Sequence, residues 1–108
     1  MPDSTDDATR VALAEKTWVP DGRYEDPMFE ATGPSAVAAM VAGAQAQFPG
    51  QKLRGTSALD AHHATARFTW ELFAADGSIT VAGLDIVEVA PDGRLARVTG
   101  FFGEPAPL

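Results

Sequence analysis

The sequence contains no cysteine, and this absence excludes disulfide bonds, thiolate metal sites and a cysteine nucleophile. Basic residues are also scarce: the chain has eight lysines and arginines but fifteen acidic residues, and its net charge is −7. Nucleic acid is therefore an unsuitable partner, because phosphate binding requires clustered basic side chains. No apolar run approaches the roughly 20 residues that span a bilayer, so we expect no membrane partner either.

The remaining composition is that of a folded domain. Of the 108 residues, 45% are hydrophobic and 21% are charged, which is typical of a chain that buries one core. We expect a single domain over residues 1–108, with residues 1–5 frayed at the N-terminus. The chain does not open on a charged and then apolar leader, which favours a cytoplasmic protein.

Three long strands are expected in the second half of the sequence, over residues 67–73, 79–90 and 94–102. Asp76-Gly77 and Asp92-Gly93 lie between them. Asp-Gly pairs favour hairpin turns, because glycine adopts positive φ at little cost. The pattern predicts a broad antiparallel sheet, one face of which must be covered.

The first half of the sequence predicts two helices that can cover this sheet. The first is expected from Asp6 or Asp7 to about Thr17, after which Pro20-Asp21-Gly22 ends it. Its apolar stripe consists of Val11, Ala14 and Trp18. The second helix begins at Thr32-Gly33-Pro34-Ser35 and ends at Pro49-Gly50.

Two shorter strands accompany the helices. Residues 23–26 read as a strand that Pro27 stops, because proline cannot continue a ladder. Tyr24 and Asp26 share one face of it. Residues 51–61 form a weaker strand, and the whole pattern is α+β.

This order of elements resembles the nuclear transport factor 2-like superfamily. The matching motifs are Tyr24-Glu25-Asp26-Pro27, Gly33 at the second helix, and Asp92-Gly93-Arg94 before a last strand that ends in Thr99-Gly100-Phe101-Phe102. Within the superfamily the chain is similar to SnoaL-like polyketide cyclases and ketosteroid isomerases. The resemblance implies a cone, in which a strongly curved antiparallel sheet packs on two helices and surrounds a pocket. The N-terminal region is shorter than is usual in the family.

Ketosteroid isomerases imply roles for individual acids. Their general base lies in a segment similar to Glu25-Asp26-Pro27, which implies that Asp26 is the base. Their neutral oxyanion-stabilising acid lies where this chain has Glu88. The resemblance implies isomerisation or cyclisation of a hydrophobic, ring-bearing carbonyl compound without cofactor or metal. Asp26 also has an ordinary structural reading, since aspartate before proline ends a strand and caps the next turn.

The alternation of side chains along the middle strand does not decide which of its two acids points into the pocket. Asp85 and Glu88 lie three residues apart, so an unbroken strand points them to opposite faces. A bulge at Gly83 would change this. Following the resemblance, we expect Glu88 to face the pocket. Asp85 is then either an auxiliary catalytic acid or a salt-bridge partner on the outer face.

Large apolar side chains either line the pocket or simply fill the core; each one alone favours the core, and as a set they permit a cavity. The candidates for substrate binding are Trp18, Tyr24, Met40, Phe68, Trp70 and Phe102. His62 and His63 are adjacent, point to opposite faces of a strand and favour a solvated turn over a metal site.

A second function stays open, namely a non-catalytic ligand-binding or dimerisation module with a filled core. Under either function we expect a homodimer through the outer sheet face, with Val87, Val89 and Phe101 in the interface.

Overall fold

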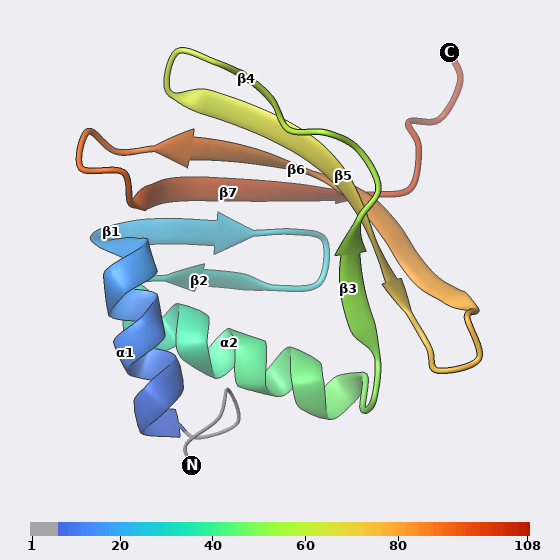
Figure 1. Ribbon diagram of the computed structural model, residues 1–108, viewed down its shortest axis with the longest axis horizontal. Helices are drawn as coiled ribbons and strands as arrows, with labels where there is room; N and C mark the ends of the chain where they lie inside the picture. The colour runs from blue at the N-terminus through green and yellow to red at the C-terminus, as the bar shows by residue number, and fades with distance from the viewer. Residues whose placement is uncertain (1–6) are drawn as a thin grey trace.

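The computed structural model describes residues 7–108 and shows a curved, open sheet with two helices at one side (Figure 1). The helices are α1 (Asp7–Thr17) and α2 (Pro34–Gln47). The strands are β1 (Trp18–Glu25), β2 (Glu30–Thr32), β3 (Lys52–Gly55), β4 (Asp60–His62), β5 (Thr65–Phe73), β6 (Ile79–Val89) and β7 (Leu95–Phe102). The sheet order is β2-β1-β7-β6-β5-β3, and β4 pairs with β5 outside this path. The expectations for residues 1–5 and for Asp6 as a cap lie outside the described residues.

The two predicted hairpins are confirmed and connect the three long strands β5, β6 and β7. β5 pairs with β6 and β6 with β7, both antiparallel. Gly77 and Gly93 lie in the connecting turns with φ of 87° and 90°, the left-handed conformation that other residues avoid. Asp76 and Asp92 each accept a hydrogen bond from a backbone amide two residues on, and these bonds close the turns.

The first strand departs from the expectation of an all-antiparallel sheet. β1 begins at Trp18, directly after α1, and pairs in parallel with β7, so the sheet is mixed. Pro20-Asp21-Gly22 do not interrupt the strand; the register shifts between Trp18 and Arg23 instead. Gly22 makes this irregularity possible, because a Cβ there would lie 2.8 Å from Cε3 of Trp18.

Two further strand expectations are corrected. The segment over residues 51–61 divides into β3 and β4, both of which pair with β5. Ser57 lies at the break, where its hydroxyl accepts the amide hydrogen of Thr69 in place of a backbone carbonyl. The short strand β2, which pairs with β1, was not expected from the sequence.

The buried core lies between the helices and one end of the sheet. Its members are small or flat side chains: Ala14, Trp18, Ala31, Val37, Ala38 and Val98. The two helices pack on each other and on β1 and β2, so the concave face over β5 and β6 stays uncovered (Figure 1). The exposed area of 7104 Å² exceeds the about 5,700 Å² usual for a folded monomer of this size.

Candidate functional site

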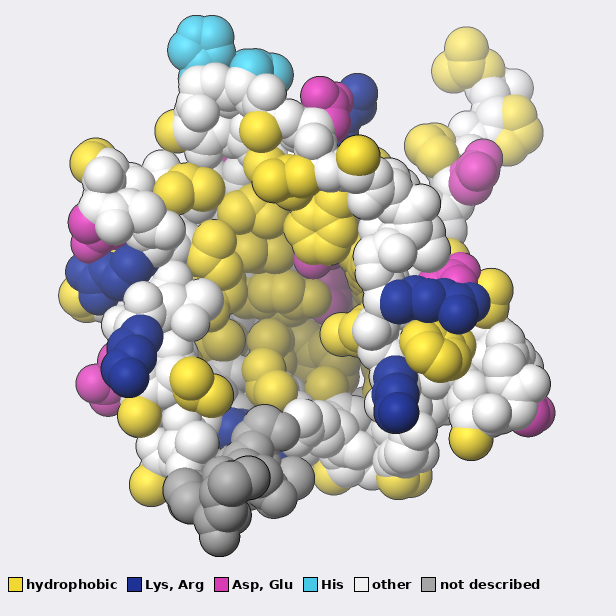
Figure 2. Space-filling model, viewed as in Figure 1, with side chains coloured by type: hydrophobic (Ala, Val, Ile, Leu, Met, Phe, Trp, Pro, Cys, Tyr) yellow, Lys and Arg dark blue, Asp and Glu magenta, His cyan; other side chains and the backbone are white. Residues whose placement is uncertain are grey.

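The uncovered concave face holds a pocket of about 250 Å³. Its lining residues are Tyr24, Leu53, Arg54, Gly55, Phe68, Trp70 and Asp85. Figure 2 shows this face as a deep hollow lined by hydrophobic side chains, with acidic atoms near its centre. The site is therefore apolar, with a carboxyl group inside it.

Asp85 reaches the pocket because of its register on β6. It lies opposite Phe68 of β5 and Gly100 of β7. The side chain is half-buried, and Nε1–H of Trp70 donates to its Oδ1 at 2.9 Å. Burial raises the pKa of Asp85 above its usual range; the bond from Trp70 opposes this rise, and the negative charge of Asp26 adds to it.

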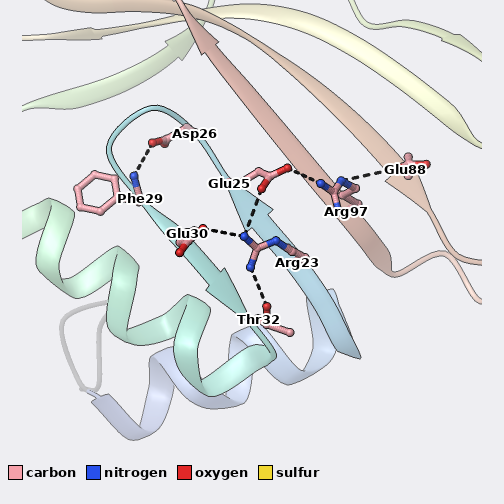
Figure 3. Close-up of polar contacts among 8 residues, drawn as sticks. All are labelled: Arg23, Glu25, Asp26, Phe29, Glu30, Thr32, Glu88 and Arg97. Atoms are coloured by element: carbon pink, nitrogen blue, oxygen red, sulfur yellow. Dashed lines mark hydrogen bonds and ion pairs between the residues drawn. The ribbon is translucent and has the colours of Figure 1, made fainter.

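Asp26 lies beside Asp85 and is held by three donors. The amides of Met28 and Phe29 donate to Oδ1 at 2.7 and 2.8 Å, and the hydroxyl of Tyr24 donates to Oδ2 at 2.5 Å. Figure 3 shows the contact with Phe29 across the connection from β1 to β2. The alternative structural reading of Asp26, as the cap of the turn after β1, is confirmed by these bonds, and the same carboxylate also accepts the hydroxyl proton of Tyr24.

Tyr24 keeps its proton in this environment. Burial raises its pKa far above the usual range for tyrosine, and the hydrogen bond to Asp26 and the charges of Asp26 and Asp85 raise it further. The pocket therefore contains a neutral hydroxyl next to two carboxyl groups.

Gly100 lets these groups approach one another across β7. A Cβ at this position would lie 3.0 Å from Oδ1 of Asp85, 3.1 Å from Cβ of Asp26 and 3.7 Å from the hydroxyl of Tyr24. A larger residue would separate the two acids, so this strand glycine is a structural requirement of the site.

The expectation that Glu88 faces the pocket is wrong. The pairing of β6 with β5 is regular from Gly83 to Glu88, so parity places Glu88 on the face opposite Asp85. Its side chain is 55% exposed and lies 4.0 Å from Nε of Arg97. Arg97 also binds Glu25, and Figure 3 shows the resulting row of charged side chains on the outer face.

The expected wall residues divide into two groups. Tyr24, Phe68 and Trp70 line the pocket. Phe102 does not line the pocket but contacts Trp70 edge-on, at 6.0 Å between ring centres. Trp18 and Met40 do not line this pocket; Trp18 belongs to the helical core and Met40 packs against it.

Sequence reasoning missed the contribution of β3, an edge strand. Leu53, Arg54 and Gly55 form the remaining side of the pocket. The signal was an apolar residue, Leu53, inside a segment that was recognised as a weak strand. Its pairing with Leu72 could not be foreseen from the residues alone.

The outer face differs from the expected one as well. Val87 packs against the core, and Val89 lies beyond a register shift and is partly buried. Leu84 and Ile86 share the outer face with Glu88, and Phe101, opposite Leu84, is 53% exposed there. Leu84, Ile86 and Phe101 are therefore large apolar side chains of this face.

Residues 7–108 contain no group of three or more histidine, aspartate or glutamate side chains that could hold a metal ion. His62 and His63 meet at the β4–β5 turn with their Nδ1 atoms 3.1 Å apart. β4 ends at His62 and His63 has a left-handed φ of 52°, so the two residues do not point to opposite faces of a strand as expected. Within the same residues, no helix is long and apolar enough to cross a membrane.

The fold and the pocket define a class: a small α+β protein with a curved open sheet and an acid-containing apolar pocket on its concave face. Residues 6–98 match the model of the SnoaL-like domain family, and the chain belongs to that family, within the nuclear transport factor 2-like superfamily. No curated protein matches the sequence.

Solved structures support this assignment. A proposed isomerase of the SnoaL-like family from Agrobacterium tumefaciens is 32% identical, with a TM-score of 0.86 over 92% of this chain and 85% of that one. A proposed SnoaL-like polyketide cyclase from Jannaschia is 16% identical, with a TM-score of 0.72 over 92% and 75%. A proposed polyketide cyclase from Sinorhizobium meliloti is 18% identical, with a TM-score of 0.66 over 93% and 94%. The last two share the fold alone.

Proposed function

We propose that this protein binds a small ring-bearing carbonyl compound in the concave pocket and moves a proton on it, as an isomerase or cyclase without a cofactor. The observation that carries this proposal is the half-buried Asp85, which sits in an apolar pocket beside a second carboxyl group. A carboxyl group whose pKa is raised is suited to take up a proton and return it. The family membership and the similar proposed isomerase support the same reaction class.

The proposed step uses side chains of this chain alone. The carboxylate of Asp85 takes the proton from the carbon next to the substrate carbonyl, and the electron pair of the broken C–H bond moves toward the carbonyl oxygen to give an enolate. Tyr24, whose hydroxyl stays bonded to Asp26, forms the pocket wall beside the reacting carbon. Asp85 then returns the proton to the same or another carbon.

We assign the base to Asp85 and not to Asp26, because Asp26 already accepts three hydrogen bonds. In this assignment Asp26 positions Tyr24. Asp26→Asn therefore lowers the rate without removing the proton-accepting group. If Asp26 were the base, the same variant would abolish the reaction.

Hydrogen exchange at carbon tests the proposal without knowledge of the natural substrate. A panel of cyclic aryl ketones is incubated with the protein in D2O, and deuterium entering next to the carbonyl is followed by NMR. We expect catalysed exchange of at least one ketone, with a rate that rises as pH increases through the pKa of Asp85, because only the carboxylate accepts a proton.

Glu88→Gln is the matched control, because Glu88 lies on the same strand but on the other face. Exchange should be unchanged in this variant. Absence of exchange for every ketone, with no binding detected by tryptophan fluorescence, would instead favour a non-catalytic module.

We also propose that two copies pair through the outer sheet face. The large exposed area of the chain and the apolar side chains of Leu84, Ile86 and Phe101 on this face support a dimer. Phe101→Asp should shift the protein to monomer, as measured by analytical ultracentrifugation. Ile79→Asp is the control. Ile79 and Phe101 are both 53% exposed, but Ile79 lies at the start of β6, next to the β5–β6 turn and outside the proposed interface. A wild-type monomer at high concentration would refute the proposal.

A further inference from the structure

We propose that Trp70 is a positioning residue for Asp85: its indole holds one carboxyl oxygen and thereby sets both the orientation and the proton affinity of the group. We further infer that Gly83 is required for this role. The effect on catalysis rests on the proposed function of Asp85. The contacts between Trp70, Gly83 and Asp85 do not depend on any substrate.

The indole of Trp70 is fixed by its two neighbours. Trp70 lies directly opposite Gly83 in the β5–β6 pair. A Cβ at Gly83 would lie 2.5 Å from Cζ2 and 2.8 Å from Cε2 of the indole, so the ring rests on the bare backbone of β6. Phe102 meets the ring edge-on at an interplanar angle of 85°. The ring therefore has little freedom to turn.

This placement directs the indole N–H along β6 to Asp85, two residues beyond Gly83. Nε1–H donates to Oδ1 at 2.9 Å. In the part of the chain from residue 7 onward, no other group is seen to donate to the carboxyl group of Asp85. One oxygen is thus anchored to the wall, and Oδ2 is left for a ligand in the pocket that Asp85 lines.

The groups around Asp85 otherwise favour its protonated form. Tyr24 and Asp26 face it from the end of β1, and the charge of Asp26 opposes ionisation. Arg54 of β3 also lines the pocket, but its guanidinium binds Glu71 and lies 4.4 Å over the ring of Phe73. The indole is therefore the neighbour that stabilises the carboxylate.

The test replaces the donor while keeping the shape. In a Trp18→Phe background, Trp70 is the only tryptophan of the chain. Biosynthetic incorporation of β-(3-benzothienyl)alanine then exchanges the indole N–H for sulfur and preserves packing on Gly83 and Phe102. The titration of Asp85 is followed by carboxyl carbon NMR in the Trp18→Phe protein with either side chain at position 70.

We expect the midpoint of the Asp85 titration to move to higher pH when the indole N–H is absent, because a hydrogen bond to the charged form has been removed. The pH dependence of ketone exchange should move in the same direction. Gly83→Ala should also displace the midpoint, since a Cβ there would meet the indole, and it would disturb β7 as well, because the same Cβ would lie 2.5 Å from the backbone oxygen of Phe101. An unchanged midpoint with the sulfur analogue would overturn the proposal and leave Trp70 a packing residue.

The two proposals fail in different ways. The titration needs neither substrate nor turnover, so it can succeed in a protein that catalyses nothing. If the midpoint moves but Asp85→Asn leaves ketone exchange intact, the positioning role stands and the proposed function of Asp85 falls.

Discussion

Asp85→Asn should slow exchange of ketone hydrogens by about 10²–10⁴-fold, the usual contribution of a positioned acid or base. Asparagine has nearly the size of aspartate, and its amide oxygen can still accept the bond from Trp70. It cannot take a proton from carbon. Ligand binding, measured by tryptophan fluorescence, should therefore persist while exchange is lost. Exchange at the wild-type rate would exclude Asp85 as the base.

The same substitution should stabilise the folded protein at neutral and higher pH. The pKa of Asp85 is raised by burial, so the folded state holds its proton more tightly than the unfolded chain does. The wild-type protein thus loses stability as pH rises from the ordinary aspartate pKa through the folded-state pKa. Asparagine does not ionise, so the variant does not lose stability in this pH range. Urea unfolding should therefore show a larger unfolding free energy for the variant than for the wild type at pH values above the folded-state pKa of Asp85. If the variant were stabilised equally at acidic and at neutral pH, ionisation of Asp85 would not be the cause of the difference.

Trp18→Ala should cost about 3–5 kcal/mol of unfolding free energy, the range for removing a large aromatic side chain from a core. Trp18 is 7% exposed and joins α1 to β1, where it packs with Ala14, Val37 and Val98. Small domains are stable by about 5–15 kcal/mol in total, so much of the stability of this one depends on a single side chain.

Urea unfolding at one pH measures this loss, with Phe101→Ala as the control. Phe101 is a large aromatic residue as well, but it is 53% exposed, so its truncation should cost far less. A loss below about 1 kcal/mol for Trp18→Ala would show that the helices pack on the sheet without it.

Local patterns predicted the hairpins and helices well, because their signals lie within a few residues. Asp-Gly pairs fixed the turns at Gly77 and Gly93 through backbone conformation. Pro34 opens α2 as its position indicated. Parity also separated Asp85 from Glu88 from the residues alone.

Local patterns could not predict which face of β6 lines the pocket. That depends on where the helices pack, and they pack on β1 and β2, which are distant in sequence from β6. The resemblance selected Glu88, whereas the regular register of β6 directs Asp85 into the pocket. The parallel pairing of β1 with β7 was missed for the same reason, since contacts between the two ends of a chain leave no local signal.

That parallel pairing also sets an order of events during synthesis. β1 pairs only with β2 and β7 in the described sheet, so it stays without its second neighbour until the last strand has been made. Tyr24 and Asp26 reach Asp85 only across Gly100 of that strand. Contacts of such long range form late, because a large loop must close first. A nascent chain that ends before Leu95 therefore carries all three side chains but no site, and the two mutually repelling carboxyl groups meet only after the chain is nearly complete.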